Sequence, residues 1–149
     1  MAGFTNRGKK NVLDAVFKAT SLPTNYYIHL VSDTPTADTN TLSDLTEVPQ
    51  SNGYSPTSLN KDATDFDTGA TEDDSSDYAY IRIKDITWTA SGGAIPASGT
   101  GALYAVITDD NATESSREVW GYWSLGSART VSDTQQLTLQ DLELRLTES

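Results

Sequence analysis

The feature that most constrains the fold is the alternation of apolar and polar residues toward the C-terminal end. The leucines of this segment are separated by single residues, apart from one step at Asp141: Leu137, Leu139, Leu142, Leu144 and Leu146. Successive side chains of a strand point to opposite faces, so this period of two predicts strands buried on one face. A chain that ends this way needs a second layer to cover its leucines.

Further segments favour strands because they are aromatic, β-branched or alternating. They are 26–31, 78–84 with a continuation through Trp88, 103–108 and 119–125. The alternation changes phase near Asp85, which predicts a bulge there. Segment 103–108 is almost wholly apolar and is expected to be buried on both faces. Short strands between turn signals predict a mainly β fold, a jelly-roll-like β-sandwich or an open barrel.

One segment, from Arg7 to Lys18, has the pattern of a helix. Thr5 or Asn6 can cap its start, and Pro23 closes the region. Its apolar residues form one stripe: Val12, Leu13, Val16 and Phe17. We expect four basic residues on the opposite face: Arg7, Lys9, Lys10 and Lys18. The chain is therefore interpreted as one domain, with an N-terminal helical arm over 1–22 and a β-sandwich body over 23–149.

The charge of the chain excludes some functions and is unevenly distributed. The formal net charge is −11, from 10 basic and 21 acidic residues, which argues against a nucleic-acid binder with a broad basic face. Residues 1–18 carry 4 − 1 = +3, and the rest carries 6 − 20 = −14. This distribution of charge indicates that the basic N-terminal segment docks on an acidic partner. The alternative is an amphipathic surface helix whose basic side chains are solvated.

Sites for catalysis, metals or cofactors are not evident in the sequence. The chain contains no Cys and a single His, His29, which is expected to be structural. There is no nucleophile elbow G-x-S-x-G, and the chain is not expected to be an enzyme. The acidic stretch 62–77 fails the register of a calcium loop and is expected to be a solvated loop, although weak Ca²⁺ binding stays open. No signal peptide or membrane span is apparent, so we expect synthesis in a cytoplasm and no membrane partner.

The aromatic residues near position 120 allow two interpretations. Trp88, Trp120, Trp123 and Tyr122 are expected to fill the core. Strict alternation along 119–125 would place Trp123 inward and Trp120 with Tyr122 on the opposite face. That face would be covered by a second layer or by a partner, or would form a stacking platform for sugar.

The ordered set of motifs resembles a group of small tailed-phage virion proteins, of the head decoration (cement) and tail-fibre-like type. The resemblance spans nearly the whole chain and is carried by these segments: the helix at 5–17, YIHLVSDTP at 27–35, TEV at 46–48, NGY at 52–54, ITWTAS at 86–91, ALYAV at 102–106, YWSL at 122–125, RTVSDTQ at 129–135 and LTL at 137–139. The long acidic stretch 62–77 departs from the shorter members of the group.

The resemblance implies a non-enzymatic virion protein with a β-sandwich fold and no cofactor. Its expected place is the outer surface of the phage head, where it would bind the major capsid protein and stabilise the shell. Arg7, Lys9, Lys10 and Lys18 are the candidate docking residues, and Trp120 and Tyr122 the candidate oligomer or partner face. A homo-oligomer, with a trimer as the guess, suits a symmetry axis. The alternatives are a small tail or tail-fibre-associated protein and a carbohydrate-binding β-sandwich.

Overall fold

The computed structural model describes residues 2–147, which form ten strands, one α-helix and two short 3-10 helices. The helix α1 spans Asn6–Lys18, and the 3-10 helices are η1 (Leu42–Asp44) and η2 (Glu114–Ser116). The strands are β1 (Ala2–Phe4), β2 (Asn25–Val31), β3 (Thr57–Asn60), β4 (Thr71–Asp73), β5 (Tyr78–Ile83), β6 (Ile86–Thr89), β7 (Ala102–Thr108), β8 (Val119–Arg129), β9 (Gln136–Leu139) and β10 (Leu142–Thr147).

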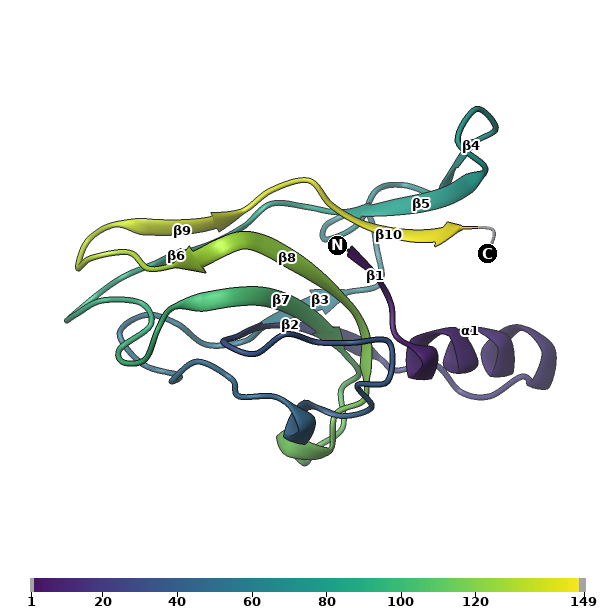
Figure 1. Ribbon diagram of the computed structural model, residues 1–149. Coiled ribbons are helices and arrows are strands. Elements are labelled where there is room, and N and C mark those ends of the chain that lie inside the picture. Colours follow the sequence, from purple (N-terminus) through teal and green to yellow (C-terminus); the bar gives the residue numbers. More distant parts are fainter. Residues whose placement is uncertain (1, 148–149) are drawn as a thin grey trace.

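The strands form antiparallel sheets in two layers. The largest sheet has the order β1-β8-β7-β2-β3, and the smaller sheets have the orders β10-β5-β4 and β6-β9. Figure 1 shows the pairs β6-β9 and β5-β10 following one another end to end above the large sheet. The fold is mainly β and sandwich-like with a single helix near the N-terminus, which confirms the fold class predicted from the sequence.

The main core lies between the two layers. It joins residues of β2 and β7 in the large sheet to the alternating leucines of β9 and β10 opposite, including Ile28, Ile107, Leu139 and Leu142. A second, smaller cluster covers the other face of the large sheet and consists of Val31, Leu42, Val106 and Val119. Strand β7 is therefore buried on both faces, as its apolar sequence predicted.

Two short interruptions divide the second layer. Lys84 and Asp85 separate β5 from β6, and Gln140 and Asp141 separate β9 from β10. Asp141 adopts a left-handed backbone conformation with φ of +54°. The phase shift predicted near Asp85 is present, but as a break between two strands in different sheets rather than as a bulge. Among residues 2–147, no helix combines the length and apolar character needed to cross a membrane.

Candidate functional site

The first turn of α1 is anchored on the start of β8. The side chain of Thr5 is fully buried and caps the helix, accepting a hydrogen bond from the backbone N–H of Gly8 at 2.9 Å. The same hydroxyl donates to the Val119 carbonyl. A Cβ at Gly8 would lie 2.0 Å from the carbonyl oxygen of Trp120, so only glycine allows this close approach.

Side chains of the first two turns hold the helix to the body through Glu118. Arg7 forms an ion pair with one carboxylate oxygen of Glu118 at 3.0 Å, and Asn11 donates to the other at 2.6 Å. Lys10 pairs with Asp14 one turn further along α1. Of the four predicted docking cations, Arg7 and Lys10 are thus engaged within the molecule. Lys9 and Lys18 are exposed and make no ion pair with the residues that the structure describes.

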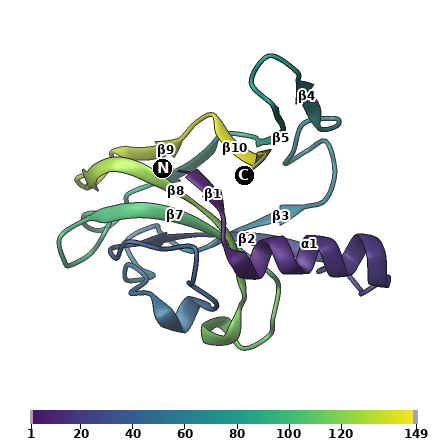
Figure 2. The ribbon, with the colours of Figure 1, turned by 45° about the vertical axis from the view of Figure 1, so that its right-hand side comes forward.

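The outer half of α1 extends beyond the β body, as Figure 2 shows. Gly8 is the one buried residue of the helix. The exposed fractions of Leu13, Val16 and Phe17 are 56%, 67% and 76%. We call these three residues the helix tip. The apolar stripe predicted from the sequence is thus real, but most of it faces solvent.

The predicted separation of basic and apolar faces on α1 is wrong for Lys9 and Lys10. An α-helix turns by about 100° per residue, so residues four and seven positions apart share a face. Lys9 precedes Leu13 by four residues and Val16 by seven, and Lys10 precedes Phe17 by seven. Both cations therefore lie beside the helix tip rather than opposite it, and the exposed face of α1 is both apolar and basic. Lys18 lies on the other side of the helix.

The predicted orientation of Trp120 is also wrong. In the register of β7 and β8, Ile107 pairs with Gly121 and Thr108 pairs with Val119, which leaves Trp120 as one extra residue. This bulge shifts the alternation, so that Trp120 and Trp123 both join the main core. Tyr122 instead packs against the smaller cluster, with its ring 6.3 Å from that of Tyr104. Trp120 and Tyr122 therefore do not form a common face. The predicted core roles of Trp88, Trp120 and Trp123 are confirmed.

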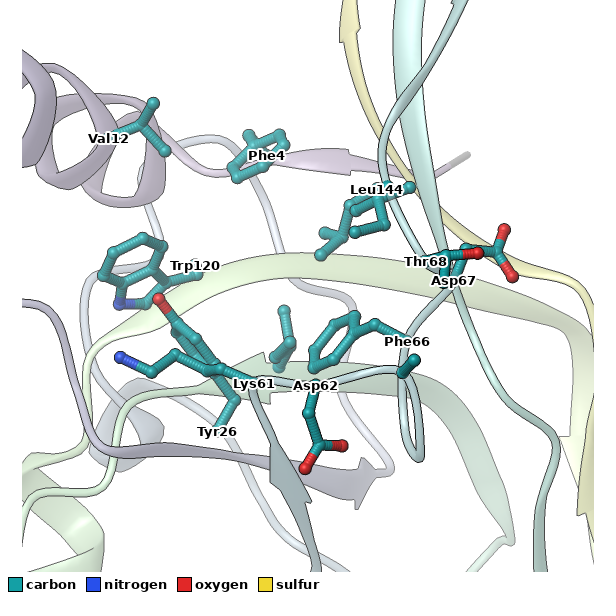
Figure 3. A pocket seen from close by; sticks show the side chains of 14 residues that line it. Phe4, Val12, Tyr26, Lys61, Asp62, Phe66, Asp67, Thr68, Trp120 and Leu144 are labelled. Atoms are coloured by element: carbon teal, nitrogen blue, oxygen red, sulfur yellow. The ribbon is translucent and has the colours of Figure 1, made fainter.

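An apolar pocket of about 430 Å³ opens beside the base of α1. Aromatic and aliphatic side chains from α1, β1, β2, β5, β7, β8, β10 and the loop 61–69 line it: Phe4, Val12, Tyr26, Phe66, Ile81, Ile107, Trp120 and Leu144. Polar residues of the loop, including Lys61, Asp62 and Asp67, border it. Figure 3 shows Trp120, Tyr26 and Lys61 at one end of the pocket, and Asp67, Thr68 and Leu144 at the other.

Among the residues that the structure describes, the indole nitrogen of Trp120 finds no hydrogen-bond partner, although Trp120 is only 7% exposed. The other two tryptophans are satisfied, since Trp88 donates to the Ser55 carbonyl and Trp123 to the Glu143 carbonyl, each at 2.8 Å. The neighbouring Tyr26 packs edge-on against Trp120 with ring centroids 5.2 Å apart. Burial, with Asp110 and Asp109 nearby, raises the pKa of Tyr26 to about 12, so its hydroxyl stays protonated at neutral pH.

His29 is fully buried in a polar network. Its Nδ1 lies 2.9 Å from Glu47, and its Nε2 lies 3.2 Å from the Thr108 hydroxyl and 3.4 Å from Arg117. Since a carboxylate accepts, Nδ1 donates to Glu47. Ligand atoms of His29, Glu47 and Glu114 lie within 4.8 Å of one another, a spacing that a metal ion could use.

The same side chains already satisfy one another, which favours a structural role for the network. Tyr54 donates to Glu47 at 2.8 Å, and Arg117 lies 3.4 Å from Glu114. Burial works to raise the pKa of Glu47, but hydrogen bonds from His29, Tyr54 and Gln50 and the charge of His29 outweigh it and lower that pKa. This arrangement stabilises an ionised Glu47.

The acidic stretch uses its carboxylates locally. Asp65 accepts hydrogen bonds from Asn60, Asp73 accepts from Ser75, and Asp67 pairs with Lys84 at 3.4 Å. Within residues 2–147, this stretch brings no three ligand groups together as His29, Glu47 and Glu114 are. Calcium binding by the stretch therefore gains no support from the geometry.

The sequence suggested the cations of α1 and the aromatic residues of β8 as candidate site residues. It did not indicate the apolar pocket that Val12 of α1 and Trp120 of β8 help to line. Gly8 carried a signal: glycine is unfavourable inside a helix, so its presence in the first turn indicates a close approach of another chain segment. Comparison of the chain with family models, with curated proteins and with solved structures finds no match.

Proposed function

We propose that the protein is a non-enzymatic structural component of a tailed-phage virion, a decoration protein that binds the outer head shell. The observation that carries the proposal is the outer end of α1, which projects from the acidic body as Figure 2 shows and carries the exposed cation Lys18 on the side away from the helix tip. A cation presented clear of an acidic body is suited to an acidic partner surface.

The distribution of charge supports attachment of an acidic body through a basic arm. Residues 1–18 carry +3 and the remaining residues −14. An acidic surface turned to solvent keeps decorated particles apart by electrostatic repulsion. Attachment through one small element is weak for a single copy, but many copies held together act with avidity. The resemblance to small virion proteins supplies the class of partner, the major capsid protein.

Location on the particle tests the proposal directly. Immunogold labelling of virions that carry this chain is expected to place gold over the whole head surface, and a stained gel to give hundreds of copies per particle. Labelling restricted to the tail would overturn the head assignment in favour of the tail or tail-fibre alternative. Absence of the protein from purified virions would overturn both.

Lys18 provides the residue-level test of docking. It is exposed at the end of α1 and lies on the side of the helix away from the helix tip. Lys18→Glu is expected to lower occupancy on virions at least about 10-fold when added to undecorated particles, because repulsion replaces attraction at every copy. Arg129→Glu makes the same charge change at the other end of β8 and is expected to bind as wild type. Equal occupancy of the two variants would contradict a role for Lys18.

The carbohydrate-binding alternative depended on Trp120 and Tyr122 sharing one face. The bulge in β8 places them on opposite faces of the sheet. The sugar platform therefore loses the arrangement on which it was based.

A further inference from the structure

The helix tip and the apolar pocket are two surfaces that the described chain leaves uncovered. We propose that the helix tip of one copy occupies the pocket of a second copy, so that the chain forms a head-to-tail homo-oligomer. Leu13, Val16 and Phe17 of one copy thereby fill the pocket beside Trp120 of the next copy. This contact joins copies of the chain to one another and does not depend on where on a particle the protein is attached.

The helix tip cannot fill the pocket of its own copy. Val12 lines that pocket, while Leu13 and Phe17 point away from it and stay more than half exposed. The base of α1 is fixed by the Thr5 cap and by Arg7 and Asn11 on Glu118. A helix of 13 residues is about 20 Å long and rigid, so its outer turns stand away from the body.

The pocket matches an apolar helix end in size and in chemistry. Its volume of about 430 Å³ is large enough for more than one apolar side chain, and its walls are aromatic and aliphatic. Trp120 forms part of its wall, and the buried indole N–H of this residue has no acceptor among the residues that the structure describes, which is rare in native proteins. In Figure 3 this nitrogen lies on the side of the indole ring that faces Tyr26 and Lys61.

The outer end of α1 supplies hydrogen-bond acceptors as well as apolar side chains. The last four carbonyls of a helix have no partner within it. Here the N–H groups of Ala19 and Thr20 both donate to the Asp14 carbonyl, which leaves the carbonyls of residues 15–18 without a backbone partner. Insertion of Phe17 would bring these carbonyls to the border of the pocket, where Lys61 offers a donor.

Charge complements the apolar fit. Lys9 lies on the face of the helix tip, with Lys10 next to it. Asp62, Asp67 and one cation, Lys61, border the pocket, and Asp67 is paired with Lys84. The chain segment that follows carries carboxylates and no cation before Arg82, which makes this side of the molecule acidic: Glu72, Asp73, Asp74 and Asp77. A basic helix end meeting an acidic rim steers the two copies together and disfavours two helix ends meeting each other.

The contact has different surfaces on its two sides, so each copy uses one helix tip and one pocket. Such heterologous contacts close into rings when the rotation between copies divides a full turn. In this assembly Lys18 stays on the outside of the contact. Loss of self-association and loss of shell binding are therefore separable: the Phe17 variants below test the first, and Lys18→Glu tests the second.

The first experiment measures mass in solution by sedimentation and light scattering. The wild-type chain is expected to sediment as a multiple of its 16.1 kDa mass. Phe17→Ala is expected to raise the dissociation constant about 30-fold or more, as for a hot-spot aromatic. Leu22→Ala removes another exposed apolar side chain outside the contact and is expected to behave as wild type. A wild-type chain that is monomeric at all concentrations would overturn the proposal and leave the helix tip to the shell protein.

A mixing experiment tests the head-to-tail geometry. Ala63→Trp places a large side chain in the pocket of its own copy, because Ala63 is an exposed residue of the lining loop. Ala63→Trp, with a blocked pocket, and Phe17→Ala, with an altered helix tip, are each expected to be monomeric when studied alone. When the two variants are mixed, the intact helix tip of Ala63→Trp is expected to enter the open pocket of Phe17→Ala. No further copy can then be added, so the product is a 1:1 dimer. In NMR spectra of that titration, the Trp120 indole resonance should shift more than those of Trp88 and Trp123. Failure to form a dimer on mixing would overturn the proposal.

Discussion

Replacement of Thr5 with valine is expected to destabilise the protein by about 2–4 kcal/mol, although the two side chains have nearly the same shape. The Thr5 hydroxyl is fully buried, accepts from Gly8 and donates to the Val119 carbonyl. Loss of the helix cap costs about 1 kcal/mol. Loss of the donor to a buried carbonyl costs about 1–3 kcal/mol more, because valine also excludes the water that would replace it.

Urea unfolding followed by tryptophan fluorescence measures this loss. In thermal unfolding, 1 kcal/mol shifts the melting temperature of a domain of this length by about 2–4 °C, so Thr5→Val is expected to melt about 4–16 °C below wild type. Thr130→Val, at an exposed position, controls for the general effect of the substitution and is expected to change stability by less than about 0.5 kcal/mol. Equal stability of the two variants would refute the assignment of Thr5 as the residue that fixes α1 to the body.

Two further predictions concern the base of α1 and the buried polar network. Gly8→Ala is expected to cost about 2 kcal/mol or more and to speed hydrogen exchange in α1, because its Cβ would lie 2.0 Å from the Trp120 carbonyl oxygen; unchanged exchange would contradict the close approach. The lowered pKa of Glu47 implies a stabilising contribution that is present above the ordinary value of 4.5 and is lost as the pH falls through the lower folded value. Glu47→Gln should therefore be less stable than wild type at neutral pH and lose less stability below about pH 4.5; parallel acid unfolding curves would exclude Glu47 as a contributor.

Local patterns in the sequence defined most of the fold. The alternating leucines of 137–146 predicted the strands that close the core, and the step at Asp141 marked the break between β9 and β10. The capping residue Thr5 and the stripe through Phe17 predicted α1. These features depend on neighbours within a few residues, which is the information that a single sequence carries.

The site depended on contacts between distant segments, which no local pattern contains. The extra residue at Trp120 arises from pairing with β7 and places Val119 and Trp123, which strict alternation puts on one face, on opposite faces of the sheet. The pocket gathers Phe4, Phe66 and Leu144 from separate parts of the chain. The partners of His29 lie 18 to 88 residues away. Periodicity alone likewise could not show that the stripe of α1 projects into solvent.

The position of the protein on the intact particle tests the central claim most directly. A cryo-EM map of the virion that carries this chain is predicted to show density for the β body at repeated positions over the outer head surface, with the end of α1 next to the shell. Density for this fold only at the tail, or on no part of the particle, would contradict the proposed function.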